Sequence, residues 1–423
     1  GVRGLSMSDF SGAAGPDLAP PPYRVLFSVG DPSGDVHAAR VAAELKRRRS
    51  DIYLFGFGGP RMASAGVVLS HDNRGCSAIG VLESLRLVPR MHRILAALRQ
   101  ILHTTPPDLV VLVDYGVFNL RLAVTAKSVG VPVLYYIPPG CWARDMLRVT
   151  ERVARWTDHV ATPFPWSAGL LTRAGAHATF VGHPLLDGVE SQPSREEARH
   201  RVGLGGDERG LAILPGSRGH EIRHILPLML RAAALARGQR PELVPLVSHA
   251  PGSDRVPLQR AASKLLPEAR FVESTADLLR ASDVGLVKSG TITLEAALAG
   301  LPMVVTYAAS PVAALQWHLH AARRVKYIAI PNILADREVV PERYGAQGRP
   351  PDLAREVLAL YDDPARREAV RSDYAGLAAQ LGQPGASRAV ADLVEAMLDQ
   401  AQRARTAGNA RSRQASVADP WRR

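Results

Sequence analysis

A lone carboxylate follows one of the most apolar stretches of the chain. Asp114 comes directly after the apolar run 109–113, where a buried parallel strand would end. A partly buried carboxylate at a strand end can act as a general base, because burial tunes its pKa. The same side chain could equally do no more than cap the helix that follows.

A glycine-containing junction in the second half of the chain is suited to binding phosphate. Ser289, Gly290 and Thr291 separate the apolar run 284–287 from a helix-like segment. The free N–H groups of a helix start favour an anion, Gly290 lets a ligand approach, and Ser289 can cap. Glu295 lies about one turn further on, where it could accept hydrogen bonds from ribose hydroxyls. The pattern indicates a nucleotide-diphosphate site, although an ordinary capped helix has the same sequence features.

The apolar run 211–214 ends in a second phosphate-like segment. Gly216, Ser217 and Arg218 follow it, so that a glycine turn is combined with a side chain that is always charged. Arginine can make bidentate contacts with a diphosphate and neutralise the charge that develops on it as a leaving group. The alternative is a solvated surface arginine.

Short polar residues also follow the first predicted strand. Ser33, Gly34, Asp35 and His37 lie beyond the run 24–30, without the glycine spacing of a dinucleotide fingerprint and without a Walker lysine. They could hydrogen-bond a sugar or a phosphate, or Ser33 or Asp35 could only start a helix.

Two other polar residues gave no firm assignment. His183 lies beside the predicted crossing between the two halves of the chain, where a structural hydrogen bond is as plausible as catalysis. Asn332 lies in a loop with Arg337 and Glu338, a combination that indicates little by itself.

The elements around these residues define the fold class. Continuous apolar runs alternate with helix-length amphipathic segments, which predicts parallel sheets covered on both faces. The predicted strands are residues 24–30, 52–59, 109–113, 131–136, 211–214, 243–247, 284–287 and 303–307. The prediction is an α/β protein of two successive doubly wound, Rossmann-like domains with a ligand cleft between them.

The polar, turn-rich stretch 188–209 marks the expected crossing between the domains. We predict an N-terminal domain over 23–190 and a C-terminal domain over 191–400 that includes the terminal helices. Residues 1–22 lack the long apolar core of a signal peptide and are expected to form a disordered leader. Residues 401–423 are expected to be a basic, disordered tail.

Composition narrows the class of protein. The 423 residues, 46% of them hydrophobic and 22% charged, are enough for two globular domains. A net charge of +12 favours polyanionic partners, but no zinc-finger spacing or aromatic-basic pattern points to nucleic acid. Cys76 and Cys141 are too few for a disulfide framework or a metal cluster, which favours the cytoplasm. No run of 18 apolar residues would span a membrane.

In order, the polar segments resemble those of the lipid-A-disaccharide synthase family, inverting glycosyltransferases with the two-domain GT-B fold. The resemblance extends from about residue 24 to residue 399. The matching segments are Ser33–His37 (S-G-D-x-H), Gly58–Met62 (G-G-P-x-M), Val113–Asn119 (I-D-x-x-x-F-N), Phe180–Pro184 (F-x-G-H-P), Leu214–Arg218 (L-P-G-S-R), Ser289–Glu295 (S-G-T-x-T-L-E) and Pro331–Glu338 (P-N-x-L-A-x-R-E).

The resemblance implies transfer of diacylglucosamine from its UDP derivative to the 6-hydroxyl of diacylglucosamine 1-phosphate, with release of UDP. Asp114 would be the base. Donor contacts would come from Gly216, Ser217, Arg218, Ser289, Gly290, Thr291, Glu295 and Asn332, and acceptor contacts from Ser33, Gly34, Asp35 and His37. Such chemistry needs no metal and no cofactor if arginine and helix N–H groups stabilise the leaving group.

The family also implies partners and a location. They are a UDP-sugar donor, an acylated glucosamine phosphate acceptor and the anionic inner face of the bacterial inner membrane, with a homodimer allowed and no nucleic acid. Residues 79–102 mix apolar side chains with Arg86, Arg90, Arg93 and Arg99, as an interfacial helix would. A helix that only covers a sheet has the same two faces.

Several positions depart from the family pattern. Asp31 and Pro32 stand where the family usually has Glu, Val117 replaces a second Asp, and 137–144 differs from the usual S-P-x-x-W-A-W. Lys288 and Asp336 replace small residues. Most departures lie in the acceptor-side half, so they bear on the acceptor rather than on the UDP-sugar chemistry. The alternatives are a related transferase with another lipid acceptor, a sugar-nucleotide epimerase, or a catalytically silent membrane scaffold.

Overall fold

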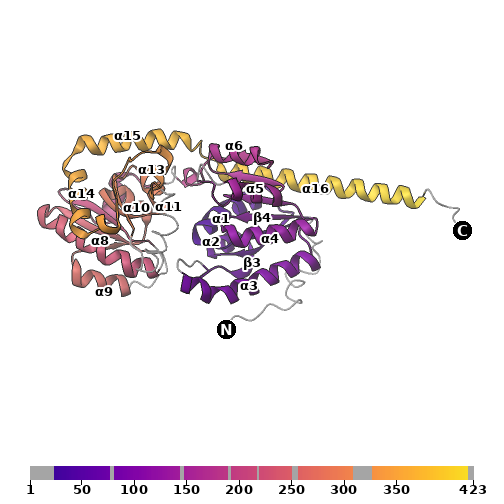
Figure 1. The fold of residues 1–423 in the computed structure, drawn as a ribbon, viewed down its shortest axis with the longest axis horizontal. Coiled ribbons are helices and arrows are strands. Elements are labelled where there is room, and N and C mark those ends of the chain that lie inside the picture. The colour runs from indigo at the N-terminus through magenta and orange to yellow at the C-terminus, as the bar shows by residue number, and fades with distance from the viewer. Residues whose placement is uncertain are drawn as a thin grey trace. The chain divides into compact units, whose positions relative to one another are not determined.

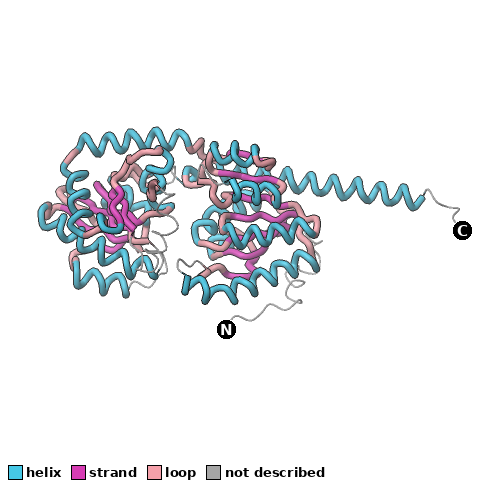
Figure 2. The backbone as a smooth tube through the Cα atoms, in the orientation of Figure 1, coloured by secondary structure: helices cyan, strands magenta, loops and turns pink. Residues whose placement is uncertain are grey.

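The computed structural model describes residues 23–76, 81–142, 147–188, 192–216, 219–249, 256–307 and 326–417 (Figures 1 and 2). The chain forms two compact units. The first consists of residues 1–187 and 381–423, and the second of residues 188–380. The expected leader, 1–22, lies outside the described residues.

The first unit is built on a seven-stranded sheet of order β3-β2-β1-β4-β5-β6-β7, in which all pairs are parallel. Its strands are β1 (Tyr23–Val29), β2 (Ile52–Gly58), β3 (Val68–Asp72), β4 (Leu109–Val113), β5 (Val133–Tyr136), β6 (His159–Thr162) and β7 (Ala178–Phe180). Successive strands are added outward from β1 on one side and from β4 on the other. The order of the sheet therefore reverses between β1 and β4.

Helices cover both faces of this sheet, as the continuous apolar strands require. They are α1 (Pro32–Arg48), α2 (Pro60–Ser64), α3 (Val81–Thr104), α4 (Gly116–Ser128), α5 (Leu147–Trp156), α6 (Pro165–Arg173), the short 3-10 helix Leu186–Gly188 and α16 (Ala386–Val417). Buried residues of α1 and α16 share one core with β1 and β4, and those of α3 and α4 share a second core.

The second unit repeats the same plan with a parallel sheet of order β10-β9-β8-β11-β12-β13. Its strands are β8 (Arg209–Leu214), β9 (Leu243–Ser248), β10 (Arg270–Val272), β11 (Ser282–Lys288), β12 (Met303–Tyr307) and β13 (Glu342–Tyr344). Its helices are α7 (Arg195–Arg201), α8 (Gly219–Gln239), α9 (Val256–Leu265), α10 (Thr275–Ala281), α11 (Thr291–Leu298), α13 (Ile330–Ala335), the 3-10 helix Gly345–Gln347, α14 (Pro350–Asp362) and α15 (Pro364–Gln380).

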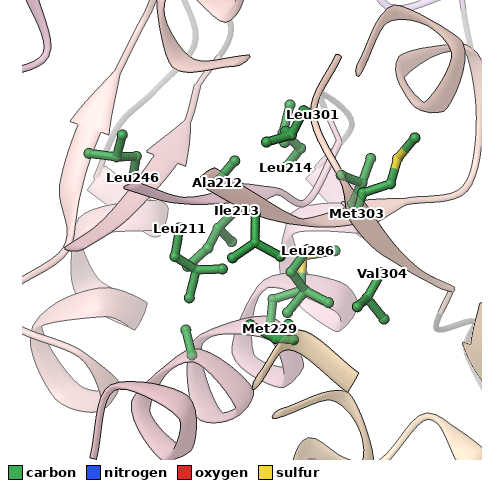
Figure 3. Packing of buried hydrophobic residues seen from close by; sticks show 14 of the residues in the cluster. Leu211, Ala212, Ile213, Leu214, Met229, Leu246, Leu286, Leu301, Met303 and Val304 are labelled. Atoms are coloured by element: carbon green, nitrogen blue, oxygen red, sulfur yellow. The ribbon is translucent and has the colours of Figure 1, made fainter. Parts of the chain in front are cut away.

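The core of the second unit centres on β8 and β11. Ile213 and Leu286 lie on neighbouring paired strands, and Met229 of α8 packs near them from the helix layer (Figure 3). All three side chains are fully buried. This packing fixes the carboxyl ends of β8 and β11, the two strands between which the order of this sheet reverses.

The terminal helix differs from the sequence-based division. We expected residues 381–400 in the C-terminal domain and 401–423 to be disordered. Instead α16 contacts α1 and β4 of the first unit, where Val390, Val394 and Leu398 are fully buried. The helix then continues to Val417, beyond the rest of its unit (Figure 1). The apolar pattern of α16 predicts that one face of the helix is buried, but it does not predict against which of the two sheets that face packs.

Among the residues described, no helix combines the length and the apolar composition needed to cross a bilayer.

Candidate active site

The carboxyl edges of the two sheets hold most of the sequence-predicted site residues. In doubly wound sheets, ligands bind outside this edge at the point where the strand order reverses. That point lies between β1 and β4 in the first unit and between β8 and β11 in the second. Asp114 follows β4, Gly216 closely follows β8 and Ser289 follows β11.

Asp114 lies in a strained turn at the end of β4. Asp114 and Tyr115 have φ values of 48° and 53°, a left-handed conformation that costs non-glycine residues about 1–3 kcal/mol each. The N-cap of α4 is Tyr115, and its N–H donates to Oδ1 of Asp114 over 2.7 Å. Strain of this kind is typical of functional sites and persists only where the surrounding structure enforces it.

Two buried side chains hold the backbone of this turn. The Asn119 amide and the Tyr135 hydroxyl both donate to the carbonyl oxygen of Asp114, each over 2.8 Å. Asn119 also donates to the carbonyl of Ser28, and its oxygen accepts from the Ser28 hydroxyl over 2.7 Å. Burial and the nearby Asp114 raise the pKa of Tyr135 well above its usual value, so Tyr135 remains a neutral donor. These contacts tie the Asp114 turn to β1 and β5.

The segment after β1 forms a helix start rather than a loop. Asp31 caps α1 by accepting from Gly34 N–H over 3.1 Å, and the Ser33 hydroxyl donates to the other oxygen of Asp31 over 2.6 Å. The alternative of a capped turn is therefore partly correct, although the cap is Asp31 and neither Ser33 nor Asp35. A contact of Ser33 or Gly34 with a ligand stays a prediction.

Asp35 is buried and already engaged by backbone donors. Its carboxylate accepts from the N–H groups of Gly59, Arg61 and Met62 at 2.9, 3.0 and 3.1 Å. It therefore fixes the start of α2 against α1, and any effect that it has on a ligand is indirect. The sequence shows the carboxylate but not the backbone donors, which come from residues more than twenty positions away.

The two histidines at this edge are buried and uncharged at neutral pH. Burial, and secondly the charge of Arg40, lower the pKa of His37 to about 4. Burial and His37 lower the pKa of His183 to about 3. Nδ1 of His183 accepts from Leu185 N–H over 3.3 Å, which favours a structural role, whereas Nδ1 of His37 has no hydrogen-bond partner in the described part of the chain.

The start of α11 has a different cap from the one expected from sequence, and its binding of a diphosphate stays a prediction. Gly290 is the N-cap, with φ of 145° and no side-chain hydrogen bond. The Ser289 hydroxyl donates to the carbonyl of Ile328 over 2.7 Å, so Ser289 is not the cap. Thr291 and Glu295 are four residues apart and share one face, on which Thr291 is exposed and Glu295 half-buried. Binding of a ligand on that face stays a prediction.

Lys288 brings a positive charge to the same place. A side chain added at Gly290 would place its first carbon 3.3 Å from Nζ of Lys288. The ammonium group therefore lies beside the backbone at the helix start. Helix N–H groups and a lysine together create the positive potential that favours a diphosphate.

Asn332 is not available to a ligand, contrary to the donor contact implied by the resemblance. It is fully buried, and its amide donates to Val340 O and to Glu342 Oε1 at 2.9 and 2.8 Å. Its oxygen accepts from the N–H groups of Val339 and Val340 at 2.7 and 2.9 Å. Its donor and acceptor groups are thus occupied within the protein, and its role is to shape the loop.

Sequence reasoning missed Glu342, the partner of Asn332. Glu342 lies on β13 and is buried, and burial raises its pKa despite hydrogen bonds from Ala329, Ile328 and Asn332. The only sequence signal was a carboxylate after the apolar pair 339–340, which is common at strand starts.

The predicted diphosphate site after β8 is described at Gly216. Gly216 has a φ of 101°, which only glycine adopts readily, so the backbone after β8 requires glycine at this position. Ser217 and Arg218 lie outside the described residues. Within the described ranges, no three His, Cys, Asp or Glu side chains are grouped as they would be around a metal ion.

The two units and their strand-edge sites define a two-domain α/β protein of the GT-B type. The calicheamicin glycosyltransferase has the same fold, with a TM-score of 0.55 and 18% identity over 89% of this chain and 98% of that protein's length. A UDP-GlcNAc 2-epimerase from Neisseria meningitidis, solved with UDP-GlcNAc, has a TM-score of 0.59 and 15% identity over 88% of this chain and 99% of its own. At these identities the similarity shows the fold alone.

The sequence comparisons show the family. The lipid-A-disaccharide synthetase family profile matches residues 25–397. Lipid-A-disaccharide synthases from Geobacter metallireducens and Myxococcus xanthus are 36% and 37% identical to this chain, over 89% of it and 98% of each relative. The chain therefore belongs to the lipid-A-disaccharide synthase family and is a glycosyltransferase, which confirms both the resemblance and the predicted fold class.

Proposed function

We propose that this enzyme transfers 2,3-diacylglucosamine from its UDP derivative to 2,3-diacylglucosamine 1-phosphate. The products are the lipid A disaccharide and UDP. The family match over residues 25–397 is the observation that carries the proposal. The strained Asp114 turn and the glycine-capped start of α11 support the proposal, because they are candidates for the base and the diphosphate site that the reaction needs.

In the proposed reaction, the acceptor hydroxyl attacks the anomeric carbon of the donor sugar. Asp114 takes the hydroxyl proton, a new C–O bond forms, and the bond from the anomeric carbon to the diphosphate breaks with inversion. The electron pair leaves on UDP. Thr291, Gly290 and Lys288 at the α11 start would stabilise that charge, together with Arg218, which is assigned from sequence alone. Glu295 would bind the ribose.

Because both substrates carry acyl chains, the enzyme would act at a membrane surface. We propose that the first turns of α3 contact the membrane. Val88 and Pro89 are exposed there, and Val88 is 45% exposed. From Ile94 onward the side chains of Ile94, Leu95, Leu98 and Leu102 are buried in the core, so that part of the segment covers the sheet. The enzyme would be peripheral on the inner face of the inner membrane. A homodimer stays a prediction.

Release of UDP tests the proposal directly. The purified enzyme is incubated with UDP-diacylglucosamine, with and without diacylglucosamine 1-phosphate, in buffer with EDTA or with magnesium. We expect acceptor-dependent UDP release that EDTA leaves unchanged. Isomerisation of the donor sugar without acceptor would indicate an epimerase, and no turnover at all would indicate a scaffold. Release only with a different acylated acceptor would change the assigned acceptor.

A further inference from the structure

We infer that Glu342 is a positioning residue for the donor site. It holds the 328–332 loop, which ends in the first turn of α13, and this loop holds the start of α11, where the proposed function places the donor diphosphate. The inference therefore rests on the proposed function. It adds a residue that would set the affinity for the nucleotide without touching it.

The carboxylate of Glu342 accepts hydrogen bonds from three residues of the 328–332 loop. Oε1 accepts from Ala329 N–H and from the Asn332 amide, both over 2.8 Å, and Oε2 accepts from Ile328 N–H over 2.9 Å. Glu342 is itself fixed by the pairing of β13 with β12, in register with Val305. One buried carboxylate thus anchors the loop to the edge of the sheet.

The anchored loop is in turn bonded to the beginning of α11. The carbonyl of Ile328 accepts from the Ser289 hydroxyl over 2.7 Å, and the N–H of Ile330 donates to Oγ1 of Thr293 over 3.1 Å. The same Oγ1 donates to the carbonyl of Gly290 over 2.8 Å. These bonds hold the residues on both sides of the Gly290 cap, the point at which the backbone N–H groups become available to a ligand.

A purely structural role is the competing explanation. A buried carboxylate that accepts backbone N–H groups stabilises the fold wherever it lies, and removing it leaves those donors unsatisfied. The two explanations differ in one observable. If Glu342 only stabilises the second unit, its loss lowers the melting temperature and leaves the UDP affinity of the folded protein unchanged.

The first experiment compares Glu342→Gln with Glu356→Gln in the full-length protein. Glu356 pairs with Arg343, the neighbour of Glu342 on β13, over 2.6 Å, so it is a half-buried, hydrogen-bonded carboxylate outside the loop and serves as the control. We expect Glu342→Gln to raise the dissociation constant of UDP about tenfold, since small misplacements of positioned groups cost up to about 10²-fold. Glu356→Gln should lower the melting temperature without changing the UDP dissociation constant.

A second readout follows the loop directly. Hydrogen exchange of the segment containing Ile328 and Ala329 should become faster in Glu342→Gln and remain unchanged in Glu356→Gln. The donor KM should rise more than kcat falls, because Asp114 lies in the other unit and is untouched. Parent protein that fails to bind UDP would refute the proposed function. Parent that binds UDP, with Glu342→Gln binding it equally well, would refute this inference alone.

If Glu342→Gln does not fold, substitutions of Thr293 test the inference instead. Thr293→Val removes the bond from Oγ1 to the loop while conserving volume, and Thr293→Ser retains the hydroxyl. We expect Thr293→Val to weaken UDP binding several-fold and Thr293→Ser to restore it. Equal UDP affinity in both variants would show that the loop does not position the α11 start, and would overturn the inference.

Discussion

Asp114 and Asp35 are both carboxylates close to the carboxyl end of a parallel strand, yet they have different hydrogen-bond partners. Three backbone N–H groups occupy Asp35, which therefore holds α2 against α1. At Asp114 the Asn119 amide and the Tyr135 hydroxyl donate to the backbone carbonyl, and the N–H of Tyr115 donates to Oδ1. The protein thus fixes the position of the half-buried Asp114 carboxylate through its backbone, which suits a base that must meet a substrate proton.

Replacing Asp114 by Asn tests this assignment at the level of one atom. The shape is kept and the basic oxygen is removed, so turnover should fall by about 10²–10⁴-fold while UDP binding is retained. UDP release and UDP calorimetry measure the two properties. Asp51→Asn, at a partly exposed ion pair with Arg49, is the control and should keep full activity. Turnover of Asp114→Asn within a few-fold of the parent would exclude Asp114 as the base.

Lys288 offers a second test at this scale. Its Nζ lies beside Gly290 at the start of α11, and a cation there should attract the diphosphate. Lys288→Met keeps most of the side-chain length, so we expect weaker UDP binding by several-fold and a smaller loss of affinity with added salt. Lys264→Met on α9 is the control. An unchanged salt dependence would show that Lys288 points away from the bound nucleotide.

Asn332 shows what sequence could not provide at this scale. The P-N-x-L-A segment was found correctly, but the contacts of Asn332 are with residues 339–342, and only the fold brings these to it. Glu342 went unnoticed for the same reason. By contrast, the position of Asp114 at a strand end was predictable, because the run 109–113 is buried on both faces and therefore uniformly apolar.

Among the helices, α16 is capped at its N-terminal end by Asp187, a residue about 200 positions earlier in the sequence. Asp187 accepts from the N–H groups of Gly385, Ala386 and Ser387 at 2.6, 3.0 and 2.9 Å, and from the Ser387 hydroxyl over 2.7 Å. Burial by itself would raise the pKa of Asp187, but these hydrogen bonds outweigh it and lower the pKa. The charged carboxylate is therefore the form that holds α16.

Asp187→Ala should destabilise the first unit by about 1 kcal/mol at pH 7, a typical cost of losing a helix cap. Because the pKa of Asp187 is lowered in the folded state, its contribution is present above the usual range of aspartate, about 3.9. That contribution disappears as the pH falls through the lowered value. Denaturation at pH 7 and pH 3 should show a smaller difference between parent and variant in acid. A difference that is independent of pH would contradict the charged cap.

The membrane contact proposed for α3 is tested best at side chains that are exposed. Arg90 donates to the carbonyls of Asp72 and Arg74 at 2.9 and 3.0 Å, so replacing it would disturb the fold. Arg93 and Val88 are exposed and suit the test better.

The paired changes Val88→Asp and Arg93→Glu should reduce co-sedimentation with vesicles that contain anionic lipid, without lowering the melting temperature. Arg61→Glu is the control, because Arg61 is exposed on α2, which packs with α1 on the other face of the sheet. Unchanged sedimentation of the paired variant would assign this part of α3 to the fold alone.

In the whole molecule, the first unit is discontinuous in sequence: residues 188–380, which form the second unit, separate its two parts. Strand and helix alternation predicted two doubly wound sheets, and the strands 109–113 and 303–307 were predicted with their observed bounds. The return of residues 381–417 to the first unit was not predicted. It depends on long-range packing of Val390, Val394 and Leu398, which local periodicity cannot show.

This discontinuity makes a prediction about fragments. Residues 188–380 are continuous and have their own core, so they should fold alone and show cooperative thermal unfolding. Residues 23–187 alone should not, because the α16 side chains that fill their core are missing. Asp187 bonds directly to Gly385, so a linker of about ten flexible residues should join 23–187 to 381–417 without strain. Circular dichroism melts of the three fragments measure this, and the joined fragment should recover cooperative unfolding. If 23–187 melts as cooperatively as the joined fragment, α16 is an accessory to the first unit rather than part of its core.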